Sequence, residues 1–400
     1  MAQNTNIDTN TDFNKAKLIE AFGEINVSAF LDKWGPEKIV QLYDPEINMQ
    51  GILVIDNTVL GPGIGGIRIS PTITPREIFQ FARATTWTCA LANIPFGGAK
   101  AGIRANLFEI DKSRYIKSFA KKISQYVPEQ YIVASDTNVS EKEIALFVEE
   151  IGDTRGATGK PERMGGIPFE LGAIGFGIGV AIETSLTTAH SFVDIPSNLS
   201  DVKIAIQGFE NIGSTVAKYI DKKGGKIVAI SDHWNTIYNK NGINIENALK
   251  YSSAATEKQS IKNYKPAKLL PKEEIIKVDC DIFVSTSGRN VLTEETVDFL
   301  KAKMVVEGVN NPIAPAADQI LHQKRTLILP NILTNAGAVI SSYAEYTGKS
   351  AEMAFSWIES KVKENTKLVV QRSLEVNIPV RRTAKEIAKE RILEAMEEKT

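Results

Sequence analysis

The sequence predicts an α/β fold with two domains, one built on a mixed sheet and the other on a doubly wound parallel sheet. The chain has 400 residues, more than a single hydrophobic core usually serves. Residues 202–231 read as strand, helix and strand, which is one βαβ unit. Further short apolar runs follow this unit, and such runs are typical of strands buried in a parallel sheet.

Helical and strand-like segments alternate in the first half of the chain. Residues 1–12 are polar and rich in Asn and Thr, and we expect a disordered tail there. Pro75 stands where the first turn of a helix accepts proline. The predicted helices of this half are 13–45, 75–94 and 112–126, and the predicted strands are 51–55 and 131–134.

The second half opens after a break at 186–201 that contains Thr, Ser, Asn and Pro and predicts a linker. Thr383 to Glu386 have the spacing of a capping box, which would open a helix in the C-terminal region. The expected strands are 202–207, 226–231, 282–284, 304–306 and 327–329, with a helix over 214–223. We therefore expect domains at 13–190 and 191–345, and C-terminal helices at 346–400 that pack back on the first domain.

The composition is that of an ordinary soluble protein, with 43% hydrophobic and 24% charged residues and a formal net charge of -1. No basic excess points to nucleic acid, and no apolar stretch has the length of a membrane span. The start of the chain has no signal-peptide pattern and there are only two cysteines, so we expect a cytoplasmic protein. The three histidines are scattered, and we expect no metal site.

A glycine-containing turn lies between the strand at 202–207 and the helix that follows it. It reads Gly208, Phe209, Glu210, Asn211, Ile212 and Gly213. The dinucleotide-binding pattern G-x-G-x-x-G occurs in this setting, so the sequence predicts a Rossmann-like site. Glu210 replaces the middle glycine, and its charge and bulk stand where the backbone normally approaches a pyrophosphate.

Asp232 ends the next strand, about 20 residues beyond the turn, where an acidic side chain commonly bonds the ribose hydroxyls. This position favours NAD as the cofactor, with NADP as the alternative. A Rossmann-like turn that no longer binds nucleotide tightly is the competing interpretation, because of Glu210.

Several short runs, in their order and spacing, resemble the glutamate/leucine/phenylalanine/valine dehydrogenase family, with the glutamate dehydrogenase branch most similar. The resemblance covers nearly the whole chain after residue 13. The runs are 65–68 (GGIR), 94–100 (IPFGGAK), 134–136 (ASD), 158–161 (TGKP), 207–213 (QGFENIG), 306–312 (VEGVNNP) and 331–337 (NILTNAG).

The resemblance implies reversible oxidative deamination of an L-amino acid to a 2-oxo acid and ammonia, with NAD(P). Lys100 matches the family's catalytic lysine and Asp136 its proton-transfer aspartate. A lysine buried among glycines can act as a general base. The competing interpretations are a surface lysine in a glycine-rich turn and, for Asp136, a helix N-cap before the 140–150 segment.

Some ligand-binding positions of the family are changed. Ile64, before Gly65 and Gly66, replaces a lysine that pairs the side-chain carboxylate in glutamate-preferring members. Thr88 replaces a lysine that binds the substrate α-carboxylate, and a hydroxyl is a weaker partner for that group. Ile174 replaces a threonine near the nicotinamide amide. At three other positions the chain keeps the polar residues that the family pattern places in contact with cofactor and substrate: Asn310, Asn335 and Ser342.

Three hypotheses follow from these positions. The first is an active amino acid dehydrogenase for glutamate or a less polar amino acid. The second is a catalytically silent or regulatory homologue that binds a metabolite or assembles with an active paralogue. The third is a dehydrogenase of an unusual amine without an α-carboxylate, which would explain Thr88. The resemblance also implies a homo-oligomer, commonly a hexamer, built through the first domain.

Overall fold

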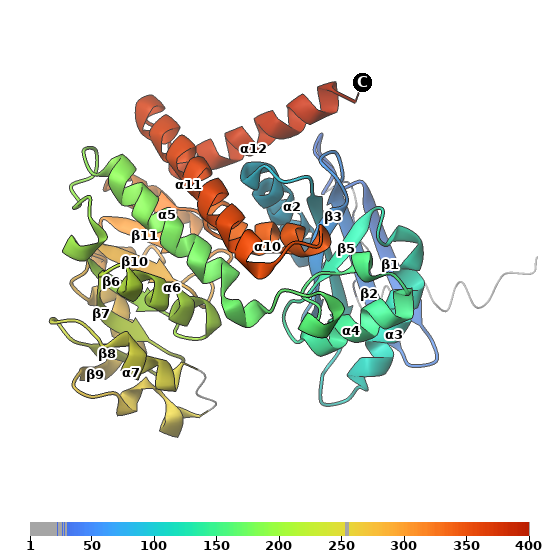
Figure 1. Cartoon of the computed structure of the whole chain (residues 1–400), viewed down its shortest axis with the longest axis horizontal. Helices are drawn as coiled ribbons and strands as arrows, with labels where there is room; N and C mark the ends of the chain where they lie inside the picture. Colours follow the sequence, from blue (N-terminus) through green and yellow to red (C-terminus); the bar gives the residue numbers. More distant parts are fainter. Residues whose placement is uncertain (1–21, 23–25, 27, 29, 253–255, 400) are drawn as a thin grey trace, which may run out of the picture.

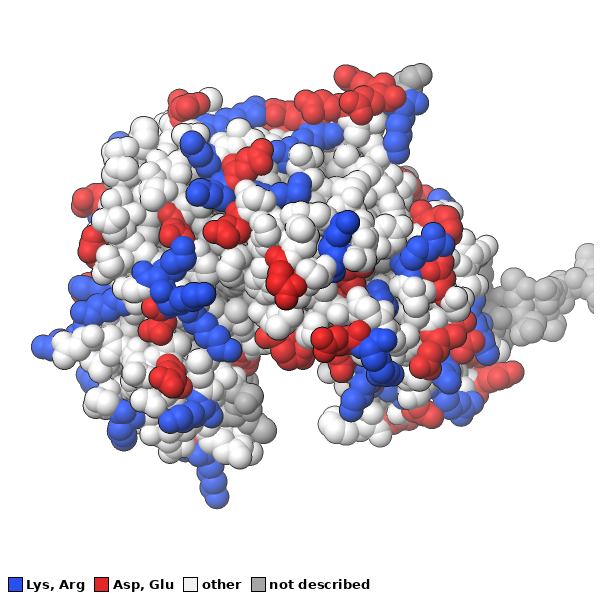
Figure 2. Space-filling view, viewed as in Figure 1, with Lys and Arg blue, Asp and Glu red and all other residues white. Residues whose placement is uncertain are grey.

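The fold contains two sheets, one in each half of the chain, with long helices between and above them (Figure 1). The computed structural model describes residues 22, 26, 28, 30–252 and 256–399. The predicted tail at 1–12 lies outside the described residues. On the face shown in Figure 2 the molecule is hollowed between two lobes, and acidic and basic side chains are interspersed over both.

The first sheet has five strands in the order β1-β2-β4-β3-β5. Its first two pairs are antiparallel and its last two are parallel, so the predicted mixed sheet is confirmed. The strands are β1 (Lys38–Asp44), β2 (Met49–Asn57), β3 (Gly63–Ile69), β4 (Gly97–Arg104) and β5 (Tyr131–Ala134).

Three helices cover the two faces of this sheet: α2 (Pro75–Ala92), α3 (Lys112–Ile123) and α4 (Glu141–Ile151). Side chains alternate between the faces of a strand. Leu53 and Ile55 of β2 accordingly pack in one apolar cluster with α3 and α4, while Ile52 and Val54 pack in another with α2. Both faces of β2 are therefore buried.

The prediction of a helix over 13–45 was wrong at its end. Residues Lys38–Asp44 form β1, which pairs with β2 along its whole length, from Lys38 opposite Ile55 to Asp44 opposite Met49. Pairing with a buried strand outweighs the local helical preference of such a short segment.

The second sheet has seven strands in the order β12-β11-β10-β6-β7-β8-β9. The five from β12 to β7 are parallel, as predicted, and β8 and β9 add an antiparallel edge. The strands are β6 (Lys203–Gln207), β7 (Lys226–Ser231), β8 (Asn235–Tyr238), β9 (Lys268–Pro271), β10 (Ile282–Ser285), β11 (Met304–Glu307) and β12 (Leu327–Leu329). We call this sheet and its helices the nucleotide domain.

Long helices join the two domains (Figure 1). The remaining helices are α5 (Ala173–Ala189), α6 (Asn211–Lys222), α7 (Ile245–Ala248), α8 (Pro315–Gln323), α9 (Asn331–Thr334), α10 (Ala336–Tyr346), α11 (Ala351–Val376) and α12 (Val380–Glu397). Helix α12 returns to α2, where the Arg391 side chain donates hydrogen bonds to the carbonyls of Ala90 and Leu91. Lys361 of α11 donates to the Asn93 carbonyl just beyond α2, at 2.9 Å.

Two predicted boundaries differ from the structure. Helix α5 continues to Ala189, so the break expected at 186–201 begins later. Helix α12 begins at Val380 after Pro379, three residues before the predicted cap at Thr383. Proline fixes a backbone angle suited to helix entry, and Thr383 instead lies inside the first turn.

The prediction that no apolar stretch has the length of a membrane span was wrong: one described stretch, Phe169–Ala189, is long and apolar enough to cross a membrane by length and composition alone. Of its most apolar window, 61% is buried inside the protein. It contains α5, which belongs to the main apolar cluster together with residues of α6, α10 and α11. This burial is that of a core helix.

Candidate active site

A cavity of about 710 Å³ lies between the two domains. From the first domain it is lined by Arg68, Phe81 and Asp136, together with further residues between positions 135 and 170. From the other side it is lined by Ile174, Ile212, Gly288, Arg289, Gly308, Val309, Asn310 and Asn335. We call this cavity the cleft.

Lys100 and Asp136 meet beside the cleft. Lys100 is on β4 and Asp136 follows β5, with β3 between these strands. The Lys100 Nζ lies 2.6 Å from the Asp136 Oδ2. Gly65 and Gly66 of β3 make this approach feasible, since a Cβ atom on Gly66 would lie 2.7 Å from the Cβ of Asp136. A Cβ on Gly65 would be only 1.8 Å from the Ala99 carbonyl oxygen.

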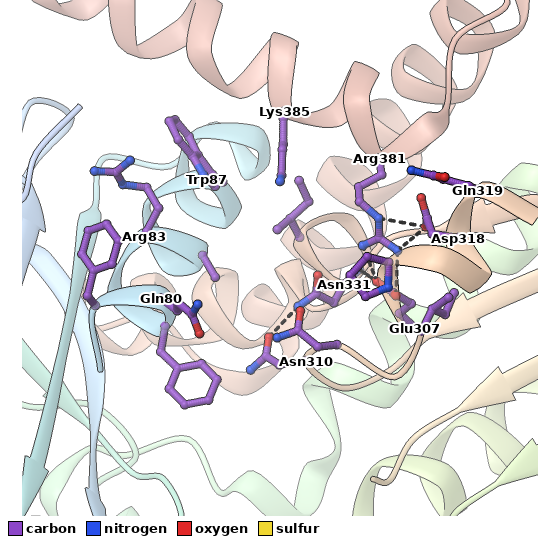
Figure 3. Close-up of a pocket in the computed structure, with 17 residues that line it drawn as sticks. Gln80, Arg83, Trp87, Glu307, Asn310, Asp318, Gln319, Asn331, Arg381 and Lys385 are labelled. Atoms are coloured by element: carbon purple, nitrogen blue, oxygen red, sulfur yellow. Dashed lines mark hydrogen bonds and ion pairs between the residues drawn. The ribbon is translucent and has the colours of Figure 1, made fainter. Parts of the chain in front are cut away.

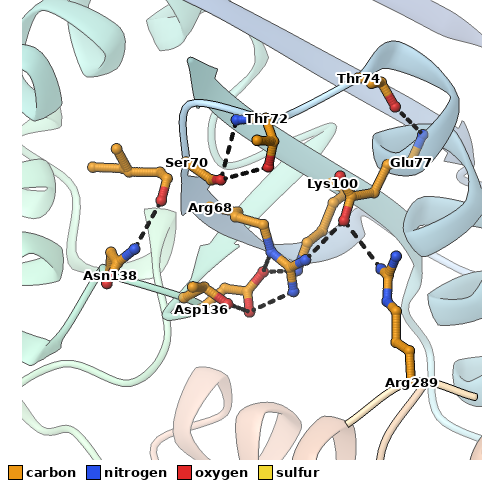
Figure 4. A network of polar contacts seen from close by, with 11 residues as sticks. Arg68, Ser70, Thr72, Thr74, Glu77, Lys100, Asp136, Asn138 and Arg289 are labelled. Atoms are coloured by element: carbon orange, nitrogen blue, oxygen red, sulfur yellow. Dashed lines mark hydrogen bonds and ion pairs between the residues drawn. The ribbon is translucent and has the colours of Figure 1, made fainter. Parts of the chain in front are cut away.

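Arg68 extends this ion pair into a network that crosses the cleft (Figure 4). Its Nε and Nη2 donate to the two carboxylate oxygens of Asp136, at 3.0 and 3.3 Å. Its Nη1 donates to Glu77 Oε1 at 3.1 Å, and the same oxygen accepts a 3.0 Å bond from Arg289 of the nucleotide domain. The network therefore joins three cations to two carboxylates.

The charges around Asp136 set its protonation. Burial alone would raise the pKa of this carboxyl group, but the Lys100 ammonium and the Arg68 guanidinium outweigh it and hold the pKa well below its ordinary value of 3.8. Asp136 is thus a carboxylate in this arrangement. It does not cap a helix, because Ser140 and Glu143 form the capping box of α4.

The predicted nucleotide turn has the expected local geometry. Gly208 has a φ of 92°, and a Cβ atom on Gly213 would lie 2.0 Å from the Gly208 carbonyl oxygen, so both positions require glycine. Phe209 is buried in the core. Glu210 is exposed, at the residue before α6, and its side chain makes no capping bond there.

The first two residues of α6 are Asn211 and Ile212, and Ile212 lines the cleft. The free N–H groups of a helix start favour phosphate, and the carboxylate of Glu210 works against that preference. Since the backbone at Glu210 has a negative φ, the side chain fits without strain and leaves the glycine positions undisturbed. Glu210 therefore disfavours phosphate binding through its charge and not through backbone strain.

Asp232 is buried and holds a turn after β7. Its Oδ1 accepts hydrogen bonds from the backbone N–H groups of Trp234 and Asn235, each at 2.8 Å. Its Oδ2 accepts one from the N–H of Ile261 at 3.1 Å. A ribose contact at Asp232 would have to share these oxygens.

Three predicted cofactor residues line the cleft together: Ile174, Asn310 and Asn335. Ile174 presents an apolar surface. Asn310 accepts a hydrogen bond from the Asn331 side chain at 2.5 Å. The Oδ1 of Asn335 is buried and has no partner within the described residues. A buried acceptor without a donor is costly, and the carboxamide N–H₂ of a nicotinamide would satisfy it.

The positions predicted to bind substrate are less accessible. Thr88 is 7% exposed, and its hydroxyl donates to the Ala84 carbonyl of its own helix at 2.9 Å. Ile64 is 2% exposed. Ser342 accepts a bond from the hydroxyl of Thr158 at 3.1 Å. None of the three lines the described cleft.

Arg68 and Glu77 were not among the predicted site residues, and neither were Arg289 or the ion pair of Lys160 with Glu345. Lys160 and Glu345 are both buried, with 2.7 Å between the Lys160 Nζ and the Glu345 Oε1. Glu345 also accepts hydrogen bonds from the backbone N–H groups of residues 159, 160 and 167. Arg68 stands in the run GGIR, so the alternation of β3 could have indicated it. Arg289 follows a strand's carboxyl end, where ligands of open α/β sheets bind.

A second cavity, of about 530 Å³, lies between α2, α12 and the nucleotide domain (Figure 3). Its wall includes Arg381, whose guanidinium binds Glu307 and Asp318. Asn310 borders both cavities. The Arg381 guanidinium is thus already paired with two carboxylates.

Comparison with known proteins agrees with this geometry. The family model described as Glutamate/Leucine/Phenylalanine/Valine dehydrogenase matches residues 165–400. The model of the Glu/Leu/Phe/Val dehydrogenase dimerisation domain matches residues 36–153.

Curated relatives are similar over most of the chain. A glutamate dehydrogenase of Aeropyrum pernix is 33% identical, covering 78% of this chain and 77% of its own. An NADP-specific glutamate dehydrogenase of Saccharolobus shibatae is 31% identical, covering 79% and 74%.

Among solved structures, the hetero-hexameric glutamate dehydrogenase of Thermus thermophilus, in a Leu-bound form, has the same fold. It has a TM-score of 0.80 and 22% identity, with 98% of this chain and 96% of that chain covered. Together with the matches over both halves of the sequence, these findings mean that this chain belongs to the glutamate/leucine/phenylalanine/valine dehydrogenase family.

Proposed function

We propose that this protein catalyses the reversible oxidative deamination of an L-amino acid to a 2-oxo acid and ammonia, with NAD(P). The observation that carries the proposal is the Lys100–Asp136 pair, 2.6 Å apart and beside a cleft whose other wall holds an Asn335 oxygen with no partner among the described residues. The family and the two curated relatives support a dehydrogenase. They do not favour the silent homologue or the amine dehydrogenase.

The reaction needs two kinds of proton transfer. A nicotinamide dinucleotide bound in the cleft would supply the acceptor for the hydride that leaves Cα of the amino acid. The Lys100 ammonium must first release its proton to solvent, and the free amine then takes a proton from the water that adds to the iminium carbon. Asp136 exchanges protons with the nitrogen, which leaves as ammonia while the carbonyl oxygen of the 2-oxo acid comes from that water. Both side chains start within hydrogen-bond distance of each other, so a proton can pass between them.

The residues of the nucleotide wall fit the cofactor. Asn335 would accept from the carboxamide, Asn310 would contact the same end, and the start of α6 would hold the pyrophosphate. The position of Asp232 after β7 favours NAD, although its carboxylate would have to share a ribose contact with backbone N–H groups, and the NADP-specific relative keeps NADP as the alternative. Glu210 is expected to weaken the pyrophosphate contact.

We include a homo-oligomer in the proposal. The first domain matches a dimerisation model, and Phe108 on this domain is 98% exposed, which is unusual for a large apolar side chain. The similar Thermus thermophilus protein is hetero-hexameric, so a hexamer, alone or with a paralogue, is the expected assembly. Light scattering of the purified protein measures it. A cytoplasmic location accompanies the proposal, consistent with Cys89 and Cys280 both being free and buried.

The proposal is tested by assaying purified protein for NADH and NADPH formation with a panel of L-amino acids. The reverse reaction is assayed with the matching 2-oxo acids and ammonium. We expect turnover with at least one amino acid and one of the two cofactors. Absence of turnover with every pair, in folded protein, contradicts the proposal.

A further inference from the structure

We propose that Arg289 is the residue that binds the α-carboxylate of the substrate, which makes the nucleotide domain part of the substrate site. This inference rests on the proposed function. An amino acid or 2-oxo acid brings a carboxylate into the cleft, and such a group needs a cationic partner there. Thr88 cannot be that partner, because its side chain is uncharged and bonds within its own helix.

Three of the described residues that line the cleft carry a positive charge: Arg68, Lys160 and Arg289. Lys160 is 5% exposed and held by both Glu345 and the Ala157 carbonyl oxygen. Its charge is already compensated inside the protein. Lys160 is therefore not free to bind a substrate.

Arg68 is also committed. It donates two bonds to Asp136 and one to Glu77, and its side chain is 19% exposed. Turning it toward a substrate would break its two bonds to Asp136 and remove one of the two cations beside that carboxylate. Lys100, behind it, has its ammonium on Asp136 and is the proposed base.

Arg289 differs from these cations. Within the described residues its ion pair is a single 3.0 Å contact to Glu77, and 54% of its side chain is exposed. Its guanidinium lies over the ring of Phe81, with 5.3 Å to the ring centre. A planar guanidinium with a free edge can bind a carboxylate through two parallel bonds, and the aromatic ring below keeps it oriented.

Glu77 marks the position of the carboxylate. One oxygen of Glu77 bonds both the Arg68 and the Arg289 guanidinium, so a carboxylate already lies between two arginines that line the cleft (Figure 4). A substrate carboxylate takes over the bond from Arg289 and leaves Glu77 to Arg68. Because Arg289 follows β10 and Lys100 is on β4, the substrate is then held between the two domains.

The test is the binding of two 2-oxo acids, 2-oxoglutarate and pyruvate, to the full-length protein by calorimetry, followed by steady-state kinetics. We expect Arg289→Gln to raise the dissociation constant of both acids about 10- to 100-fold, as for a lost charge-assisted bond. KM should rise more than kcat falls, and Arg289→Lys should restore part of the affinity. Arg382→Gln, an exposed arginine with one carboxylate partner, is the matched control and should bind both acids as the wild type does.

The outcomes separate this inference from the proposed function. Turnover by the wild type with unchanged binding in Arg289→Gln overturns the inference alone. Weaker binding in Arg289→Gln, without turnover by the wild type, keeps the inference and overturns the function. If Arg289→Gln binds 2-oxoglutarate more weakly but pyruvate unchanged, Arg289 contacts a side-chain carboxylate, which contradicts the α-carboxylate role. The inference is also contradicted if neither acid binds to the wild type.

Discussion

The two walls of the cleft differ in how far their polar groups are satisfied within the protein. On the first domain, Lys100, Asp136, Arg68 and Glu77 bond one another, so that wall is complete before any ligand arrives. On the nucleotide wall, Ile174, Ile212 and Val309 are apolar, and the Asn335 oxygen has no partner among the described residues. This difference indicates that the first-domain wall is arranged for proton transfer and the nucleotide wall for holding a ligand.

The first prediction concerns the complete wall and has the largest expected effect. Lys100→Met removes the base and should lower kcat about 10²- to 10⁴-fold, the range typical of general acid–base catalysis. Asp136 keeps its two bonds to Arg68, so the fold should persist. Steady-state kinetics and thermal unfolding measure the two effects.

The control for this substitution is Lys112→Met. Lys112 is in the same domain and lies 2.8 Å from Glu143, but it does not line the described cleft. Its loss should leave kcat within a factor of two or so, since partly exposed ion pairs contribute little. If kcat fell equally in Lys100→Met and Lys112→Met, the loss would reflect general damage to the first domain and not the removal of a base at Lys100.

Much of this wall and of the nucleotide turn could be predicted from the sequence because the information is local. The apolar run before Gly208 and the small residues beside Lys100 specify a strand, a turn and a close approach within a few residues. The pair of Lys100 and Asp136 was predicted by family resemblance, and the structure brings the two side chains together.

Other contacts could not be predicted because they join distant segments. Arg289 and Glu77 are separated by 212 positions, and no local pattern links them. The carboxylate of Asp232 is shared with the N–H of Ile261, 29 positions away, so its role in a turn was hidden. Strand β1 is similar: its seven residues become a strand only through β2.

The second prediction concerns the incomplete wall. Asn335→Leu removes a buried oxygen that has no donor within the described residues, and leaving such a group unpaired costs about 1–3 kcal/mol. We therefore expect the free energy of unfolding to stay constant or to rise. Affinity for NAD(P) should fall about 10-fold, because the carboxamide loses its acceptor.

Chemical denaturation and cofactor titration check both halves of this prediction. Asn241→Leu, on an exposed loop, is the control and should leave cofactor affinity unchanged. A marked loss of stability in Asn335→Leu, with unchanged cofactor affinity, would mean that Asn335 supports the fold and does not wait for a ligand.

The smallest expected effect is a shift in pH dependence, and it tests how the first wall maintains its charge. In Arg68→Gln the pKa of Asp136 should rise toward its ordinary value, because one of the two cations that outweigh burial is lost. The acidic limb of the kcat/KM profile should then move to higher pH. Arg155→Gln, which removes an exposed arginine paired with Asp153, should not move it.

The pH at which the fold loses stability in acid should also move upward in Arg68→Gln. A carboxyl group whose pKa is depressed on folding adds stability above its unfolded pKa and loses it as the pH falls through the folded pKa. In the wild type this loss is confined to strongly acidic solution, since Asp136 is held well below 3.8. In Arg68→Gln the loss should begin at higher pH, and unfolding measured between about pH 2 and 6 detects it. An unchanged profile would mean that Lys100 alone keeps Asp136 ionised and that Arg68 serves chiefly to position Glu77.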